Sequence, residues 1–65
     1  MTNEELLKAY FNDEQAEYNG TIYRVSEIRY AKNHGRHQVY AGLIEDRDGV
    51  KSILYAPVER CKSTG

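Results

Sequence analysis

Basic and aromatic side chains are mixed through the middle of the chain, and these are the residues best suited to chemistry. Cations bind phosphates, and exposed rings stack on nucleobases for about 1–3 kcal/mol per base. The segment therefore predicts a surface for single-stranded nucleic acid, with Arg24 and Arg29 framing one face. Alternatively, its tyrosines are core residues with their hydroxyls at the rim. The candidate binding residues are Tyr23, Arg24, Arg29, Tyr30, Lys32, His34, Arg36, His37 and Tyr40.

Two of these residues, His34 and His37, have the spacing H-x-x-H, which could hold a metal ion with help from Cys61 or an aspartate. Lys32 and Arg36 stand beside them and would repel a cation. We therefore interpret residues 31–37, which show no apolar periodicity, as a solvated loop. We expect neither a metal nor a cofactor.

Catalytic groups are scarce. Cys61 is the one cysteine, and a nucleophilic thiol needs a neighbouring base and a lowered pKa, which the sequence does not supply. Glu45, Asp46 and Asp48 fall short of the ligand count of a calcium loop. The chain has no glycine-rich phosphate loop, and a chain of 65 residues offers little volume for a pocket. We expect a protein that is not an enzyme and has no catalytic residues.

The net charge of −1 conceals an uneven distribution. Residues 1–19 carry five carboxylates and one lysine, a net charge of −4, whereas residues 20–40 carry four cations and one carboxylate, a net charge of +3. The two segments either dock on each other or serve solubility. A single cysteine allows no internal disulfide, and we find neither a secretory signal nor an apolar run that could span a membrane. We expect a cytoplasmic protein.

The first element is a helix over about residues 2–11. Thr2 and Glu5 have the spacing of a capping box, and Asn12-Asp13 provides a turn that ends the helix. A helix this short is unstable alone, so its apolar stripe must dock on the rest of the chain or on a partner. The stripe consists of Leu6, Leu7, Tyr10 and Phe11.

The rest of the chain predicts short antiparallel strands. The segment 38–56 alternates with period two on both sides of a turn at residues 46–49, which predicts a hairpin with Leu43 and Leu54 in the core. Asn19-Gly20 predicts a second, two-residue turn. The alternation then changes parity at Ser26-Glu27, which indicates a β-bulge.

Pro57 ends the last strand of the hairpin, residues 58–60 form one tight turn, Cys61-Lys62 forms a final edge, and residues 63–65 are frayed. The prediction is one domain of the α+β class, mostly β, with a helix packed on about five strands.

This strand count and the break Ala56-Pro57-Val58-Glu59 resemble the small SH3-like barrels, over about residues 17–62. The resemblance implies a module that binds peptides or nucleic acids. The chain has neither tryptophan nor the paired-tyrosine acidic segment of proline-binding SH3 domains, so no residue role is carried over.

Two functions remain open. The first is a small binding module or regulator that acts through a protein–protein surface, self-association included, using the apolar stripe or a free strand edge. The alternative is single-stranded nucleic-acid binding through residues 23–40.

Overall fold

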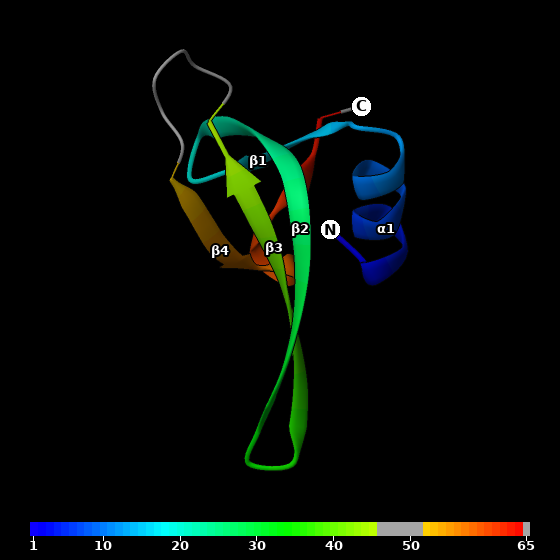
Figure 1. Ribbon diagram of the computed structural model, residues 1–65, viewed down its shortest axis with the longest axis vertical. Helices are drawn as coiled ribbons and strands as arrows, with labels where there is room; N and C mark the ends of the chain where they lie inside the picture. Colours follow the sequence, from blue (N-terminus) through cyan, green and yellow to red (C-terminus); the bar gives the residue numbers. More distant parts are fainter. Residues whose placement is uncertain (46–51, 65) are drawn as a thin grey trace.

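A computed structural model describes residues 1–45 and 52–64 and contains one helix and one antiparallel sheet (Figure 1). The strand order is β4-β3-β2-β1-β5, so the first four strands form a meander and the last returns beside the first. The predicted α+β class with mostly β structure is confirmed, and the arrangement is compatible with a small barrel. The elements are α1 (Asn3–Phe11), β1 (Gln15–Tyr18), β2 (Thr21–Asn33), β3 (Arg36–Ile44), β4 (Ile53–Pro57), the 3-10 helix η1 (Val58–Arg60) and β5 (Lys62–Ser63).

The capping box of α1 is formed as predicted. The backbone N–H of Glu5 donates to Thr2 Oγ1 at 3.1 Å, and the backbone N–H of Thr2 donates to Glu5 Oε1 at 2.8 Å. The Thr2 backbone N–H, followed by the Thr2 side chain, holds the pKa of the Glu5 carboxyl below its usual value. The helix ends where Asn12 N–H donates to the Lys8 carbonyl oxygen at 2.9 Å and Asp13 takes a left-handed φ of 56°.

Each of the two described hairpin turns has two central residues with positive φ. Asn19 and Gly20 have φ values of 53° and 79° and join β1 to β2, as predicted. His34 and Gly35, with φ values of 50° and 77°, join β2 to β3 in the same way. The expected loop at residues 31–37 is therefore wrong, because both strands run up to this turn. The strand residues here are polar on both faces since no core lies beside them, so the sequence shows no apolar alternation.

The β-bulge predicted at Ser26-Glu27 is confirmed. Val25 pairs with Leu43 and Glu27 pairs with Gly42, so Ser26 is the extra residue on β2. Past the bulge the side-chain parity is inverted: Glu27 points out of the sheet and Ile28, paired with Ala41, points in. This inversion decides on which face each later residue of β2 lies.

The core lies between one face of the sheet, α1 and η1. The central hairpin is confirmed in its strands, since Leu43 on β3 pairs with Leu54 on β4, while its predicted turn at residues 46–49 lies outside the described residues. Leu43 is fully buried, but the expectation that Leu54 is a core residue is wrong: it is 39% exposed because β4 is an edge strand. The buried residues are Leu6, Ala9, Ala16, Val25, Ala41, Leu43, Ala56, Val58 and Cys61.

The C-terminal residues Ser63 and Thr64 are ordered against β1, whereas the sequence predicted fraying. Ser63 pairs with Ala16 in the β1–β5 ladder, and the Thr64 hydroxyl donates to the Gln15 carbonyl oxygen at 3.2 Å. The expected fraying of residues 63–65 is thus corrected for Ser63 and Thr64, because β5 completes the sheet. In the described part of the chain, no helix has the length and apolar character needed to cross a membrane.

Candidate nucleic-acid interface

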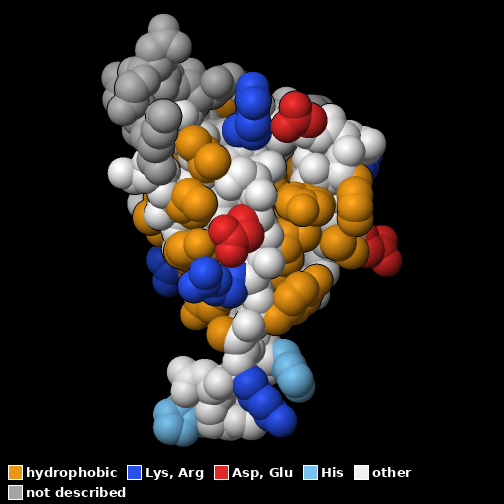
Figure 2. Space-filling model, viewed as in Figure 1, with side chains coloured by type: hydrophobic (Ala, Val, Ile, Leu, Met, Phe, Trp, Pro, Cys, Tyr) orange, Lys and Arg blue, Asp and Glu red, His pale blue; other side chains and the backbone are white. Residues whose placement is uncertain are grey.

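The end of the β2–β3 hairpin projects from the body as a two-stranded ribbon (Figure 1). β4 accompanies β3 only as far as the pair Tyr40↔Pro57, so residues 30–39 extend beyond the rest of the sheet. We call residues 30–39 the arm. The molecule measures 39 × 23 × 21 Å along its principal axes, and the arm accounts for the elongation. No aspartate or glutamate occurs between Ile28 and Ile44, and the face seen in Figure 2 shows basic and histidine side chains on the arm without acidic ones.

The two faces of the arm carry different side chains. Directly paired residues share a face, and successive residues alternate between faces. Tyr30 pairs with Val39 and Lys32 pairs with His37 on the inner face, which continues the core-facing side of the sheet. The outer face carries Arg29, Ala31, Asn33, Arg36, Gln38 and Tyr40.

The nine predicted binding residues are therefore not one surface. Tyr30, Lys32 and His37 share the inner face of the arm, and His34 lies in its turn. Tyr23 lies on the same side of the sheet but back in the body, where it is half-buried against the core. The register places Arg24, Arg29, Arg36 and Tyr40 on the outer face.

The outer face holds Arg29 in a local cluster at the base of the arm. Arg29 Nη2 lies 3.5 Å from Glu27 Oε1, and its guanidinium carbon lies 4.2 Å from the ring centroid of Tyr55. The Tyr55 hydroxyl donates to Glu27 Oε2 at 3.0 Å. This combined ion pair and cation–π contact leaves Arg29 partly neutralised and its planar face covered by a ring.

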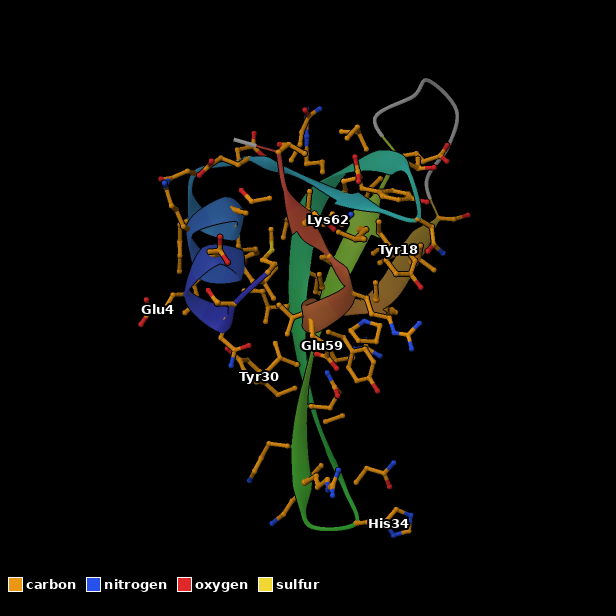
Figure 3. The ribbon with its side chains drawn as sticks, turned by 180° about the vertical axis from the view of Figure 1, so that it is seen from behind. Glu4, Tyr18, Tyr30, His34, Glu59 and Lys62 are labelled. Atoms are coloured by element: carbon orange, nitrogen blue, oxygen red, sulfur yellow. The ribbon has the colours of Figure 1, made fainter. Side chains whose placement is uncertain are left out.

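Two further carboxylates lie beside the basic segment and reduce its positive charge. Arg24 Nε lies 3.9 Å from Asp13 Oδ1, which ties the basic middle of the chain to its acidic beginning. Gln38 Nε2 donates to Glu59 Oε2 at 3.1 Å, which brings a carboxylate to the body end of the arm (Figure 3). The backbone N–H of Glu59, followed by the Gln38 amide, lowers the pKa of the Glu59 carboxyl, so it is ionised at neutral pH.

The inner face presents an open ring followed by a lysine and a histidine. Tyr30 is 70% exposed where the arm leaves the body, whereas the tyrosines at positions 18, 23, 40 and 55 are half-buried (Figure 3). Lys32 and His37 are exposed and stand one pair further along the same face, about 7 Å from Tyr30 along the strand. This spacing suits a ligand with alternating flat and anionic groups.

The arm forms no enclosed site. A half-open depression beside it is lined by Asn33, His34, Arg36, His37, Gln38 and Tyr40. Among residues 1–45 and 52–64, no three potential metal ligands come together, and His37 is paired with Lys32 across the ladder. Small-molecule sites are more enclosed and more apolar than this half-open depression, whose lining is about half polar. The arm therefore suits an extended polymer better than a compact ligand.

Cys61 lies away from the arm in the core. Its side chain is 1% exposed, and its Sγ donates to the Pro57 carbonyl oxygen at 3.5 Å. Burial raises the pKa of the thiol. A buried thiol with a raised pKa is a packing residue and a poor nucleophile.

The predicted apolar stripe of α1 is divided between core and surface. Leu6 is buried together with Ala9. Leu7, Tyr10 and Phe11 remain 40%, 42% and 77% exposed, and the rings of Tyr10 and Phe11 meet edge to face with centroids 5.1 Å apart. The helix thus docks on its own sheet with one side and leaves an apolar side open.

Sequence reasoning missed three residues that contact the basic segment, namely Glu27, Tyr55 and Glu59. Counting the side-chain alternation along β2 past the bulge would have placed Glu27 on the same face as Arg29. The contact with Tyr55, however, depends on the pairing of β3 with β4. Comparison of the chain with protein-family models, with curated proteins and with solved structures gives no match.

Proposed function

We propose that the protein is a small non-enzymatic binding module whose arm contacts the phosphates of nucleic acid. The observation that carries the proposal is a projecting, acid-free ribbon with exposed cations at Lys32 and Arg36. Cations of this kind release counterions from the phosphate backbone, and this release drives binding. A two-stranded ribbon is also narrow enough to follow a strand or to enter a groove.

The slightly negative overall charge is compatible with this function. Residues 28–44 carry three cations, Arg29, Lys32 and Arg36, and no carboxylate, so the remainder of the chain has a net charge of −4. Three residue steps along a strand move the tip about 10 Å from the body. The Debye length is about 8 Å at physiological ionic strength, so repulsion between phosphates and the acidic body is largely screened when the tip binds.

The proposal is tested by fluorescence anisotropy with labelled oligonucleotides of about 12 nucleotides, single-stranded and duplex. We expect binding that weakens steadily as salt rises from about 50 to about 200 mM. The double variant Lys32→Gln/Arg36→Gln removes both tip cations. It should weaken binding and lower the salt dependence of log K by about 1.4, because each phosphate contact on a single strand contributes about 0.7.

A matched control removes the same charge elsewhere. Lys8→Gln/Lys62→Gln changes two exposed lysines on α1 and β5, away from the arm. This variant should bind as the unmodified protein does. Equal losses in both double variants would mean that net charge, and not the arm, governs binding, and the absence of binding to any oligonucleotide at low salt would contradict the proposal.

We also propose that the sheet is of the SH3-like barrel type. The support is the meander of four strands, the return of β5 to the side of β1, and the one-turn helix η1 that precedes β5. An experimental structure in which β5 pairs with a strand other than β1 would contradict this assignment.

A second candidate function, docking on a protein partner, is favoured by the open side of α1. Leu7, Tyr10 and Phe11 lie three and four residues apart, the spacing with which an amphipathic helix anchors in a groove. Deleting the helix is an unsuitable test because Leu6 and Ala9 belong to the core. Sedimentation velocity of the protein and of Leu7→Ser/Phe11→Ser tests one such partner, a second copy. Concentration-dependent association that the variant abolishes would support this function, and a monomer at all concentrations would exclude self-association.

A further inference from the structure

We infer that the inner face of the arm binds single-stranded nucleic acid, with a base stacked on Tyr30 and the neighbouring phosphates at Lys32 and His37. This inference rests on the proposed function. It specifies that binding occurs on the inner face of the arm and that the ligand is single-stranded. It replaces the nine-residue surface expected from the sequence with three residues in two adjacent cross-strand pairs.

Tyr30 is placed to receive a base. Its ring is 70% exposed although Ile28, the preceding residue on the same face, packs against the core. Its cross-strand partner Val39 also packs against the core, so the position of Tyr30 is fixed at the rim where the core ends. A base that covers this ring removes an exposed aromatic surface from water without any rearrangement of the body.

A lysine and a histidine that can bind phosphate follow the ring along the arm. Lys32 and His37 form the next pair outward on the same face, so a strand whose base lies on Tyr30 has its backbone beside them. His34 lies beyond this pair, within the turn, while Arg36 beside the turn belongs to the outer face. No carboxylate of residues 28–44 lies between these groups, because the segment has none.

The outer face does not offer the same combination. Its best stacking group, the guanidinium of Arg29, already lies 4.2 Å from the Tyr55 ring centroid. The carboxylate of Glu27 stands at the base of that face and repels phosphates. The inner face is therefore the one on which ring stacking and phosphate binding can occur together.

An unpaired base is required because the contact is made with its flat side. In a duplex, both flat sides of each base are covered by neighbours, and proteins reach only the edges in the grooves. Exposing a base in a duplex costs a few kcal/mol of stacking and pairing. A ring held at the side of a rigid ribbon should therefore select single strands.

The test compares three probes by anisotropy or competition: a single-stranded oligonucleotide, a duplex of the same sequence, and inorganic polyphosphate, which has charge but no bases. The variants are Tyr30→Ala, Tyr30→Phe and, as a control ring outside the arm, Tyr10→Ala. Circular dichroism melts check that each variant is folded. The expected result is a preference for the single strand that Tyr30→Ala reduces about 5- to 150-fold, with Tyr30→Phe and Tyr10→Ala near the unmodified protein. Polyphosphate competition should be unaffected by Tyr30→Ala.

The outcomes separate the inference from the proposed function. If single strand, duplex and polyphosphate bind equally well and Tyr30→Ala changes none of them, the arm is a phosphate-binding element and the stacking inference is overturned. Tighter binding of the duplex would likewise overturn it in favour of groove entry. If none of the three probes binds at low salt, both the inference and the proposed function are wrong.

Discussion

Gly42 and Glu27 approach so closely across the β2–β3 ladder that a Cβ atom on Gly42 would lie 2.7 Å from the Cβ of Glu27. The approach occurs at the bulge, where Ser26 is the extra residue. The bulge turns Glu27 toward Arg29 and Tyr55 on the outer face and leaves Tyr30 on the inner face. One backbone irregularity in the body therefore sets the distribution of charge and rings on the arm.

Gly42→Ala should destabilise the protein by about 1–3 kcal/mol, because the added methyl group overlaps a β-carbon that can move only with the backbone. Urea unfolding monitored by circular dichroism measures the loss. In a Glu27→Gly background the methyl group meets no β-carbon, so the same substitution should cost clearly less. Equal costs in the two backgrounds would show that the Gly42–Glu27 contact does not limit the side chain at position 42.

Leu43→Ala should lower the free energy of unfolding by about 2–5 kcal/mol, because the side chain is fully buried in the core. Leu54→Ala, at the paired position on the edge strand, should cost distinctly less because Leu54 is 39% exposed. The two variants are matched in chemistry and differ in burial. A larger loss of stability in urea for Leu54→Ala than for Leu43→Ala would contradict the assignment of β4 as an edge strand.

The capping box predicts a pH dependence of stability. Hydrogen bonds to Thr2 lower the pKa of the Glu5 carboxyl in the folded protein relative to its ordinary value of 4.5. The carboxylate therefore stabilises the fold at pH values above 4.5, and this contribution is lost as the pH falls through the lowered pKa. Thermal melts of the protein and of Glu5→Ala should differ at pH 7 and converge at the acidic end. A constant difference down to pH 2 would contradict the assigned role of the charge.

Cys61 should react slowly with thiol reagents such as dithionitrobenzoate in the native protein and rapidly in denaturant. Its side chain is 1% exposed and burial raises the pKa of its thiol, so both access and thiolate fraction are low. The Leu43→Ala variant, if folded but weakened, should react faster through more frequent opening of the core. Rapid native labelling would show that the η1 region does not cover the thiol.

The helix, its capping box, the Asn19-Gly20 turn and the bulge were all predictable, because each depends on residues within a few positions of one another. The arm was not, since a ribbon beyond the core needs no apolar alternation and His34-Gly35 is a less obvious turn than Asn19-Gly20. The exposure of Leu54 depends on which strand forms the sheet edge, and this is a property of the whole topology. The candidate residues were identified by type, but their division between two faces required the register.

The most direct measurement is an amide chemical-shift titration of the isotopically labelled protein with a single-stranded oligonucleotide of about 12 nucleotides, at low and then at physiological salt. We expect shifts concentrated at residues 30–37, smaller at higher salt, with little change at Leu7 and Phe11 on α1. Shifts spread over the helix, or no shifts at either salt concentration, would contradict nucleic-acid binding by the arm.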